Sequence, residues 1–217
     1  MPEPTEAEAF VRANTVIAAP SLVPEIELHL ASEVVPLWHA TEASMAKIQL
    51  PPPYWGFAWA GGQALARFLL DRPKLARGKR ALDFGAGSGL VAIAAARAGA
   101  SVTAAEIDPY ACAAIRLNAA LNGVRVEIEA EDAIGRADAP WQLILVGDMC
   151  YERPLSERLT AWLRTLAGKG AEVLLGDPGR AYLPKTGLEP LARYVVPTTR
   201  DLEDRESREG VVWRLVG

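Results

Sequence analysis

The chain has 217 residues and a mass of 23.3 kDa, enough for one α/β domain with a short extension but not for two such domains of ordinary size. Its formal net charge of −4 and pI near 5.4 do not favour a nucleic-acid-binding protein, and two cysteines are too few for a disulfide scaffold or a cysteine-rich zinc site. No apolar stretch reaches the ~20 residues of a membrane span, and the acidic N-terminus lacks the pattern of a signal or transit peptide, so we expect a cytoplasmic monomer with no metal and no membrane or nucleic-acid partner.

An N-terminal extension is predicted to precede the main domain. Residues 5–13 have the pattern of a short helix, with Thr5 and Glu8 spaced as a capping box. The apolar residues 26, 28 and 30 alternate with polar ones, which is the period of a half-buried strand. Three prolines at 51–53 interrupt whatever precedes them. We therefore expect an extension over 1–50 and a main domain over 51–217.

The main domain is predicted to alternate strands with helices. A helix that starts at Gly62 ends near Pro73. After it, apolar runs at 80–84, 101–106, 124–130, 143–148 and 172–177 predict strands, and the stretches 90–100, 109–123 and 155–166 predict helices. This alternation favours a mostly parallel sheet with helices on both faces. Segments 194–199 and 211–216 have no helical pattern between them and predict a C-terminal antiparallel hairpin.

The stretch LDFGAGSGL at 82–90 has the pattern of a ligand-binding loop between a strand and a helix. Its glycines, Gly85, Gly87 and Gly89, permit a tight turn and a close approach of a ligand to the helix N-terminus. The dinucleotide fingerprint G-x-G-x-x-G has a different spacing. Asp83, just before the first glycine, would repel a diphosphate and suits a ligand with a positive amino group.

Two further acids follow the next two strands. Glu106 ends the strand after the loop, where a carboxylate can accept both hydroxyls of a ribose. Asp132 follows the third strand, where a carboxylate could accept from the exocyclic amine of adenine. Because parallel strands end at one edge of a sheet, Asp83, Glu106 and Asp132 should converge on one crevice. An ammonium, a ribose and an adenine together describe S-adenosylmethionine.

The motif D-x-G-x-G-x-G, followed by an acid after the second strand, resembles the seven-strand, Rossmann-like methyltransferases over about residues 62–217. The resemblance implies an α/β fold with a seven-stranded, mostly parallel sheet. Another kind of nucleotide-binding Rossmann domain is the alternative. The fourth strand ends in VGDMCY, whose Asp148 and Tyr151 resemble the D-x-x-Y pattern of the lysine-specific branch.

A lysine ammonium has a pKa near 10.4 and cannot attack until it loses a proton, while a carboxylate beside an aromatic face can hold and aim its nitrogen. We therefore interpret Asp148 as an orienting acceptor rather than a strong base. A polar loop residue, or an N-cap of the helix predicted at Leu155, is the alternative.

The segments 54–71, 147–152 and 176–180 (GDPGR) together resemble the lysine methyltransferases of the electron transfer flavoprotein β subunit. This resemblance implies S-adenosylmethionine as donor and lysines of that β subunit as acceptors. It assigns acceptor-side roles to Asp148 and Tyr151, and cofactor-binding roles to Asp83, Gly85, Gly87, Gly89, Glu106 and Asp132. Eukaryotic members of the family are mitochondrial, and because the transit pattern is missing we expect a bacterial cytoplasmic version.

Other residues leave alternatives open. Trp59, close to Gly61 and Gly62, is predicted to bind the cofactor by lining the cofactor and substrate cleft, while Trp55 and Phe57 fit a core equally well. Arg180 could pair with Asp177 or with an acidic substrate residue. The alternative for GDPGR is a Pro-Gly turn held by an ion pair.

Different acceptors, and no catalysis at all, are also compatible with these motifs. Pro-Pro-Tyr at 52–54 is reminiscent of enzymes that methylate base amines, but Pro51 offers no polar side chain in front of it. A ribosomal protein, another lysine protein, a small amine such as nicotinamide, or a non-catalytic binding module remain alternatives.

Overall fold

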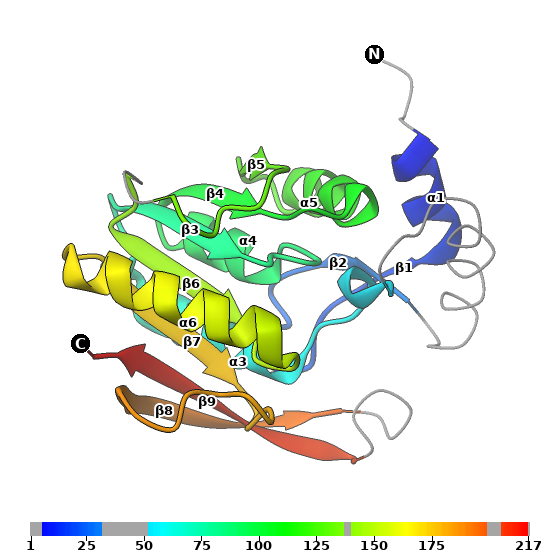
Figure 1. Ribbon diagram of the computed structural model, residues 1–217. Coiled ribbons are helices and arrows are strands. Elements are labelled where there is room, and N and C mark those ends of the chain that lie inside the picture. Colours follow the sequence, from blue (N-terminus) through cyan, green and yellow to red (C-terminus); the bar gives the residue numbers. More distant parts are fainter. Residues whose placement is uncertain (1–5, 32–51, 137–139, 199–204, 217) are drawn as a thin grey trace.

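Figure 1 shows the computed structural model, which describes residues 6–31, 52–136, 140–198 and 205–216. Two predictions, Thr5 as N-cap and the boundary between residues 50 and 51, lie outside these residues. Among the described helices, none is long and apolar enough to cross a membrane.

A seven-stranded sheet forms the centre of the described structure, with strand order β5-β4-β3-β6-β7-β9-β8 (Figure 1). Its strands are β3 (Arg80–Phe84), β4 (Ser101–Ala105), β5 (Glu127–Glu129), β6 (Leu143–Gly147), β7 (Glu172–Asp177), β8 (Leu188–Pro197) and β9 (Ser207–Leu215). The strands from β5 to β7 pair in parallel, and β9 runs antiparallel to both β7 and β8. The predicted α/β fold with a C-terminal antiparallel hairpin is therefore confirmed.

Helices cover both faces of the sheet, as predicted (Figure 1). Helices α3 (Ala60–Asp71), α4 (Leu90–Arg97) and α5 (Pro109–Leu121) lie on one face, and α6 (Arg153–Gly168) lies on the other. Strand β6 shows why the sheet needs both layers. Its Leu143 and Leu145 belong to the core under α3 and α4, whereas Ile144 and Val146 pack against α6. A strand that is apolar on both faces is typical of a parallel sheet covered on each side.

The described part of the N-terminal extension packs beside the main domain rather than into its sheet. Helix α1 (Glu6–Asn14) lies against α5, and β1 (Val16–Ala18) pairs antiparallel with β2 (Leu28–Leu30). Val11 of α1 shares a buried cluster with Trp55 and Leu117. The extension thus supports the segment that carries η1 (Tyr54–Gly56), a short helix at the entry to the main domain.

Asn118 of α5 joins the extension to the glycine loop through two buried hydrogen bonds. Its Oδ1 accepts from the backbone N–H of His29 at 2.7 Å, and its Nδ2 donates to the carbonyl of Ser88 at 2.8 Å. Asn118 is fully buried, and His29 and Ser88 are nearly so. The amide therefore satisfies one donor of β2 and one acceptor of the loop that have little access to water.

Replacing Asn118 by alanine is expected to lower the free energy of unfolding by about 1–3 kcal/mol, because it leaves two buried backbone groups unsatisfied. Urea denaturation measures the change. The matched control is Asn14→Ala at the end of α1, where one half-buried bond to Phe10 is lost and the expected change stays within about 0.5 kcal/mol. Equal losses in the two variants would show that Asn118 does not connect these segments.

Candidate active site

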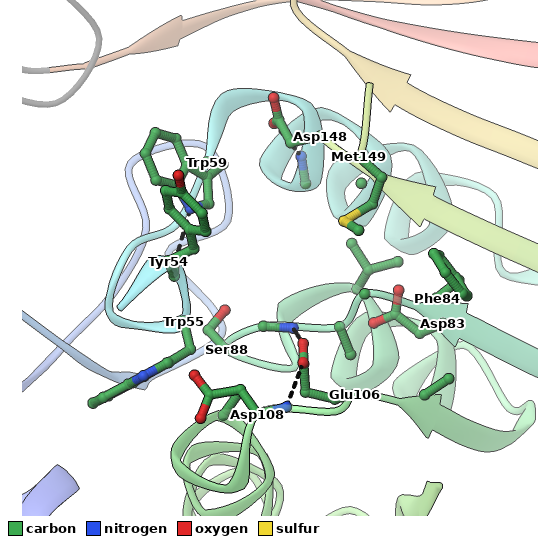
Figure 2. A pocket seen from close by; sticks show the side chains of 18 of the residues that line it. Tyr54, Trp55, Trp59, Asp83, Phe84, Ser88, Glu106, Asp108, Asp148 and Met149 are labelled. Atoms are coloured by element: carbon green, nitrogen blue, oxygen red, sulfur yellow. Dashed lines mark hydrogen bonds between the residues drawn. The ribbon is translucent and has the colours of Figure 1, made fainter. Parts of the chain in front are cut away.

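A cavity of about 440 Å³ opens at the carboxyl ends of the parallel strands (Figure 2). Such an edge is where open α/β sheets bind ligands. With the exception of Gly89, every residue that the sequence predicted for the site lines this cavity. These residues are Trp59, Asp83, Gly85, Gly87, Glu106, Asp132, Asp148 and Tyr151.

The glycine loop approaches the cavity with its backbone. Gly85 and Gly87 have φ values of 65° and 52°, in a backbone region that residues with a Cβ rarely adopt. A Cβ on Gly85 would collide with Met149, which lies across the loop. Gly89 serves packing instead, because it is the N-cap of α4 with a φ of 80° and a Cβ there would lie 3.2 Å from Ile115. Its place in the motif is explained by contacts under the loop rather than by the cavity wall.

Asp83 is a buried acid in the cavity wall, with 1% of its surface exposed. Its Oδ2 accepts from the backbone N–H of Ala92 at 2.8 Å. Burial, supported by the negative charge of Glu106, raises the pKa of Asp83 to about 8 despite that hydrogen bond. A cationic ligand group would favour the ionised form, so the predicted partner, an ammonium, fits this position.

Glu106 holds the glycine loop and the start of α5 together. One carboxylate oxygen accepts from Gly87 N and the other from Asp108 N, both at 3.0 Å (Figure 2). Asp108 caps α5 by accepting from Tyr110 N at 2.8 Å, and burial raises the pKa of Asp108 to about 6. Asp108 was not predicted from the sequence, although an Asp before Pro109 is typical of a helix start.

Asp132 lies at the rim of the cavity and is half-exposed. Its Oδ1 accepts from the backbone N–H of Ile134 at 2.9 Å, and its Oδ2 pairs with Arg158 of α6 at 2.9 Å. Each oxygen has a second lone pair with which it could accept from a base amine. The predicted contact with adenine is thus compatible with the geometry, and Arg158 orients the carboxylate.

Asp148 directly follows β6 and has a φ of 59°, the single non-glycine residue with a positive φ among those described. Its Oδ2 accepts from the backbone N–H groups of Gly61 and, at 3.3 Å, of Gly62. These groups belong to the first turn of α3, where the helix dipole favours an anion. The alternative that Asp148 caps the helix after Tyr151 is wrong, because Glu152 occupies the N-cap of α6.

Arg180 contacts the other oxygen of that carboxylate. Its Nε donates to Asp148 Oδ1 at 2.7 Å, and its guanidinium carbon lies 5.6 Å from the centroid of the Trp59 ring. Asp177 shapes the turn that carries Arg180, since its Oδ1 accepts from the backbone N–H groups of Gly179 and Arg180, each at 2.7 Å. The predicted alternatives for Arg180 did not include this ion pair.

Three aromatic side chains, those of Tyr54, Trp59 and Tyr151, lie close together in the cavity wall. The Tyr54 ring lies 5.9 Å from that of Trp59 and 5.5 Å from that of Tyr151, centroid to centroid. Trp59 donates from Nε1 to the carbonyl of Tyr54 at 2.9 Å (Figure 2). Burial raises the pKa of Tyr151 to about 12, so its phenol stays protonated at neutral pH. Trp55 and Phe57 combine the two alternatives, because they line the cavity and also pack in a buried cluster.

Three relatives from different animals match this chain over most of its length and share one name. Electron transfer flavoprotein beta subunit lysine methyltransferase from Xenopus laevis is 41% identical over 215 residues, covering 94% of this chain and 85% of its own. The Homo sapiens protein of that name is also 41% identical, with 97% and 81% covered, and the Caenorhabditis elegans homolog is 36% identical, with 92% and 87% covered. The expectation of a bacterial cytoplasmic version is thus wrong, because these three relatives, which match over most of the chain, are from animals.

The family described as ribosomal protein L11 methyltransferase (PrmA) matches residues 32–145. Among solved structures, the magnesium protoporphyrin IX methyltransferase of Synechocystis with bound SAM has a TM-score of 0.52 at 16% identity, with 72% of this chain and 80% of that chain covered. A ribosomal protein L11 methylase from Lactobacillus delbrueckii has a TM-score of 0.51 at 21% identity, with 74% and 81% covered. These structures share the fold.

Proposed function

Since the chain belongs to the family of electron transfer flavoprotein β-subunit lysine methyltransferases, we propose that it transfers methyl groups from S-adenosylmethionine to lysine side chains of that β subunit. The observation that carries the proposal is the 41% identity to the frog relative over 94% of the chain. The cavity supports it, because the residues that we assign to the cofactor and those that we assign to the acceptor line it together at one edge of the sheet.

The residues of the cofactor side fit S-adenosylmethionine. When bound, this group supplies an electrophilic methyl on a positively charged sulfur. In this proposal Asp83 takes the ammonium, Glu106 the ribose hydroxyls and Asp132 the adenine amine, and the positive φ of Gly85 and Gly87 supports a close approach of the backbone. The raised pKa of Asp83 supports this assignment, because a buried acid gains most from a cationic partner.

The residues of the acceptor side hold an amine rather than remove its proton. Asp148 is fixed by α3 and by Arg180, and Tyr151 and Trp59 supply aromatic faces in the lining of the same cavity. The lysine amine is aimed by these groups, and its proton passes to water before transfer. Catalysis then depends mainly on proximity and orientation, which can contribute several orders of magnitude.

The test is transfer of a labelled methyl group to purified electron transfer flavoprotein. We expect label in the β subunit with the wild-type protein. Asp148→Asn keeps a residue that tolerates positive φ, and we expect it to lower kcat at least about tenfold while cofactor affinity in calorimetry stays within about twofold. Full activity of this variant would remove Asp148 from the acceptor site.

Other acceptors are controls in the same assay. Ribosomal protein L11 and nicotinamide should remain unlabelled under conditions that label the β subunit. Label in ribosomal protein L11 alone would favour the activity named for the family that matches residues 32–145. Cofactor binding without transfer to any acceptor, including a whole lysate, would favour a non-catalytic binding module.

A further inference from the structure

Arg180 brings a permanent positive charge to the acceptor side of the cavity. Its guanidinium contacts the two groups that a lysine ammonium would use, the carboxylate of Asp148 at 2.7 Å and the face of Trp59 at 5.6 Å. Arginine stays protonated in proteins, so this charge cannot be switched off by pH. Asp148 and Trp59 border the cavity opposite Glu106 and Asp108, so the guanidinium belongs to the acceptor side (Figure 2).

We propose that Arg180 makes the acceptor site selective for the unprotonated lysine amine, an inference that rests on the proposed function. Without Arg180, the buried Asp148 carboxylate and the Trp59 face would bind an ammonium tightly, and a protonated nitrogen has no lone pair to offer. With Arg180 in place, an ammonium meets a like charge, whereas a neutral amine does not. Arg180 is thus a positioning residue: its positive charge acts on the protonation state of the bound lysine and not on the methyl group.

The surrounding charges are consistent with this role. Among the residues that the structure describes, the titratable or charged groups of the neighbouring segments are Tyr54 in η1, Asp148, Tyr151, Glu152 and Arg153 after β6, and Asp177 and Tyr182 after β7. Those around the rest of the cavity are Asp83, Glu106, Asp108, Glu131, Asp132 and Arg158. Asp177 accepts from the backbone of the turn, and the Tyr151 phenol remains uncharged at neutral pH. Asp148 is 7% exposed, so solvent screens its charge weakly, and the Arg180 guanidinium at 2.7 Å offsets that charge directly.

The first test compares the pH dependence of kcat for wild type, Arg180→Gln and Arg180→Lys at saturating electron transfer flavoprotein, because kcat reports ionisation in the enzyme–substrate complex. The rise of kcat with pH reflects loss of the lysine proton. In Arg180→Gln we expect its midpoint about one pH unit higher and kcat about tenfold lower at neutral pH, with KM no higher than in wild type. Arg180→Lys should restore most of the wild-type profile.

Arg193→Gln is the matched control, since Arg193 forms an exposed ion pair with Glu209 in the β8–β9 hairpin. The pH dependence of kcat in Arg193→Gln should match that of wild type. A wild-type midpoint in Arg180→Gln together with a raised KM would show that Arg180 binds an acidic residue of the substrate, and it would overturn the inference.

A second measurement is independent of the proposed substrate. An NMR-monitored titration with n-butylamine, in the presence of S-adenosylhomocysteine, follows binding between pH 7 and pH 10. Wild type should bind more tightly as the pH rises, because it prefers the neutral amine. Arg180→Gln should bind at least about tenfold more tightly at pH 7 than wild type, because it accepts the ammonium.

The two measurements separate the two proposals. If wild type leaves the β subunit unmethylated but the butylamine profiles differ as expected, the substrate is wrong and the role of Arg180 stands. If both proteins bind butylamine with the same pH dependence, the inference fails whatever the substrate. Thermal unfolding of each variant confirms that the comparison is made on folded protein.

Discussion

Replacing Gly61 by alanine is expected to lower the free energy of unfolding by at least about 2 kcal/mol, because the added methyl group has no space. Gly61 is the second residue of α3, and its Cβ would lie 2.6 Å from Asp148 Oδ2 and 2.7 Å from the carbonyl carbon of Gly176 on β7. Both opposing groups are backbone or held by backbone, so they cannot turn aside. The close contact of α3 with β7 is what brings its first turn onto Asp148.

Gly62→Ala is the control for Gly61→Ala, because the two glycines are neighbours in the same helix. A Cβ on Gly62 would have Val91 as its nearest neighbour, at 3.9 Å. Alanine favours a helix over glycine, so this variant should be unchanged or up to about 1 kcal/mol more stable. Urea denaturation of both proteins gives the comparison. Similar stability for the two would mean that α3 does not need its glycine contact with β7.

Asp83→Asn is expected to weaken S-adenosylmethionine binding by about 10- to 100-fold, the usual range for losing a hydrogen bond to a charged group. Asparagine keeps the shape of the side chain and can still accept from Ala92 N, so the fold should survive. Calorimetric titration of wild type and variant measures the difference. Unchanged affinity would place the cofactor's ammonium elsewhere.

The same variant should change how stability depends on pH. The pKa of Asp83 rises from 3.8 to about 8 in the folded protein, so the folded state keeps a proton that the unfolded chain loses near pH 4. This contribution to stability is complete below pH 4 and is lost as the pH rises through about 8. Between pH 6.5 and pH 9, free wild type should therefore lose more stability than Asp83→Asn. Parallel pH curves for the two proteins would contradict the raised pKa.

The sheet could be predicted from the sequence because its strands are marked locally. Residues 80–84 form β3 as expected, since a short apolar run ends in Asp83 and the glycine loop. Strand β1 was missed because three residues carry no usable period and become a strand by pairing with β2. Helix α6 begins at Arg153 rather than Leu155, and Pro154 in its first turn was an available signal.

The gathering of Asp83 and Glu106 at one cavity was also predictable, whereas the arrangement at Asp148 was not. Asp83 and Glu106 each follow the pattern of a strand end, and the fold places such ends at one edge. The contact of Asp148 with Arg180 joins residues 32 positions apart, through a turn whose direction depends on Asp177. The local pattern indicated the residue types there, but the pairing comes from how β6, β7 and α3 meet.

The intact mass of the electron transfer flavoprotein β subunit, after incubation with this protein and S-adenosylmethionine, tests the central claim most directly. We predict an increase in multiples of one methyl group, located by peptide fragmentation on lysine side chains and strongly reduced with Asp148→Asn. A β subunit of unchanged mass, with wild-type protein that binds the cofactor, would contradict the proposed function.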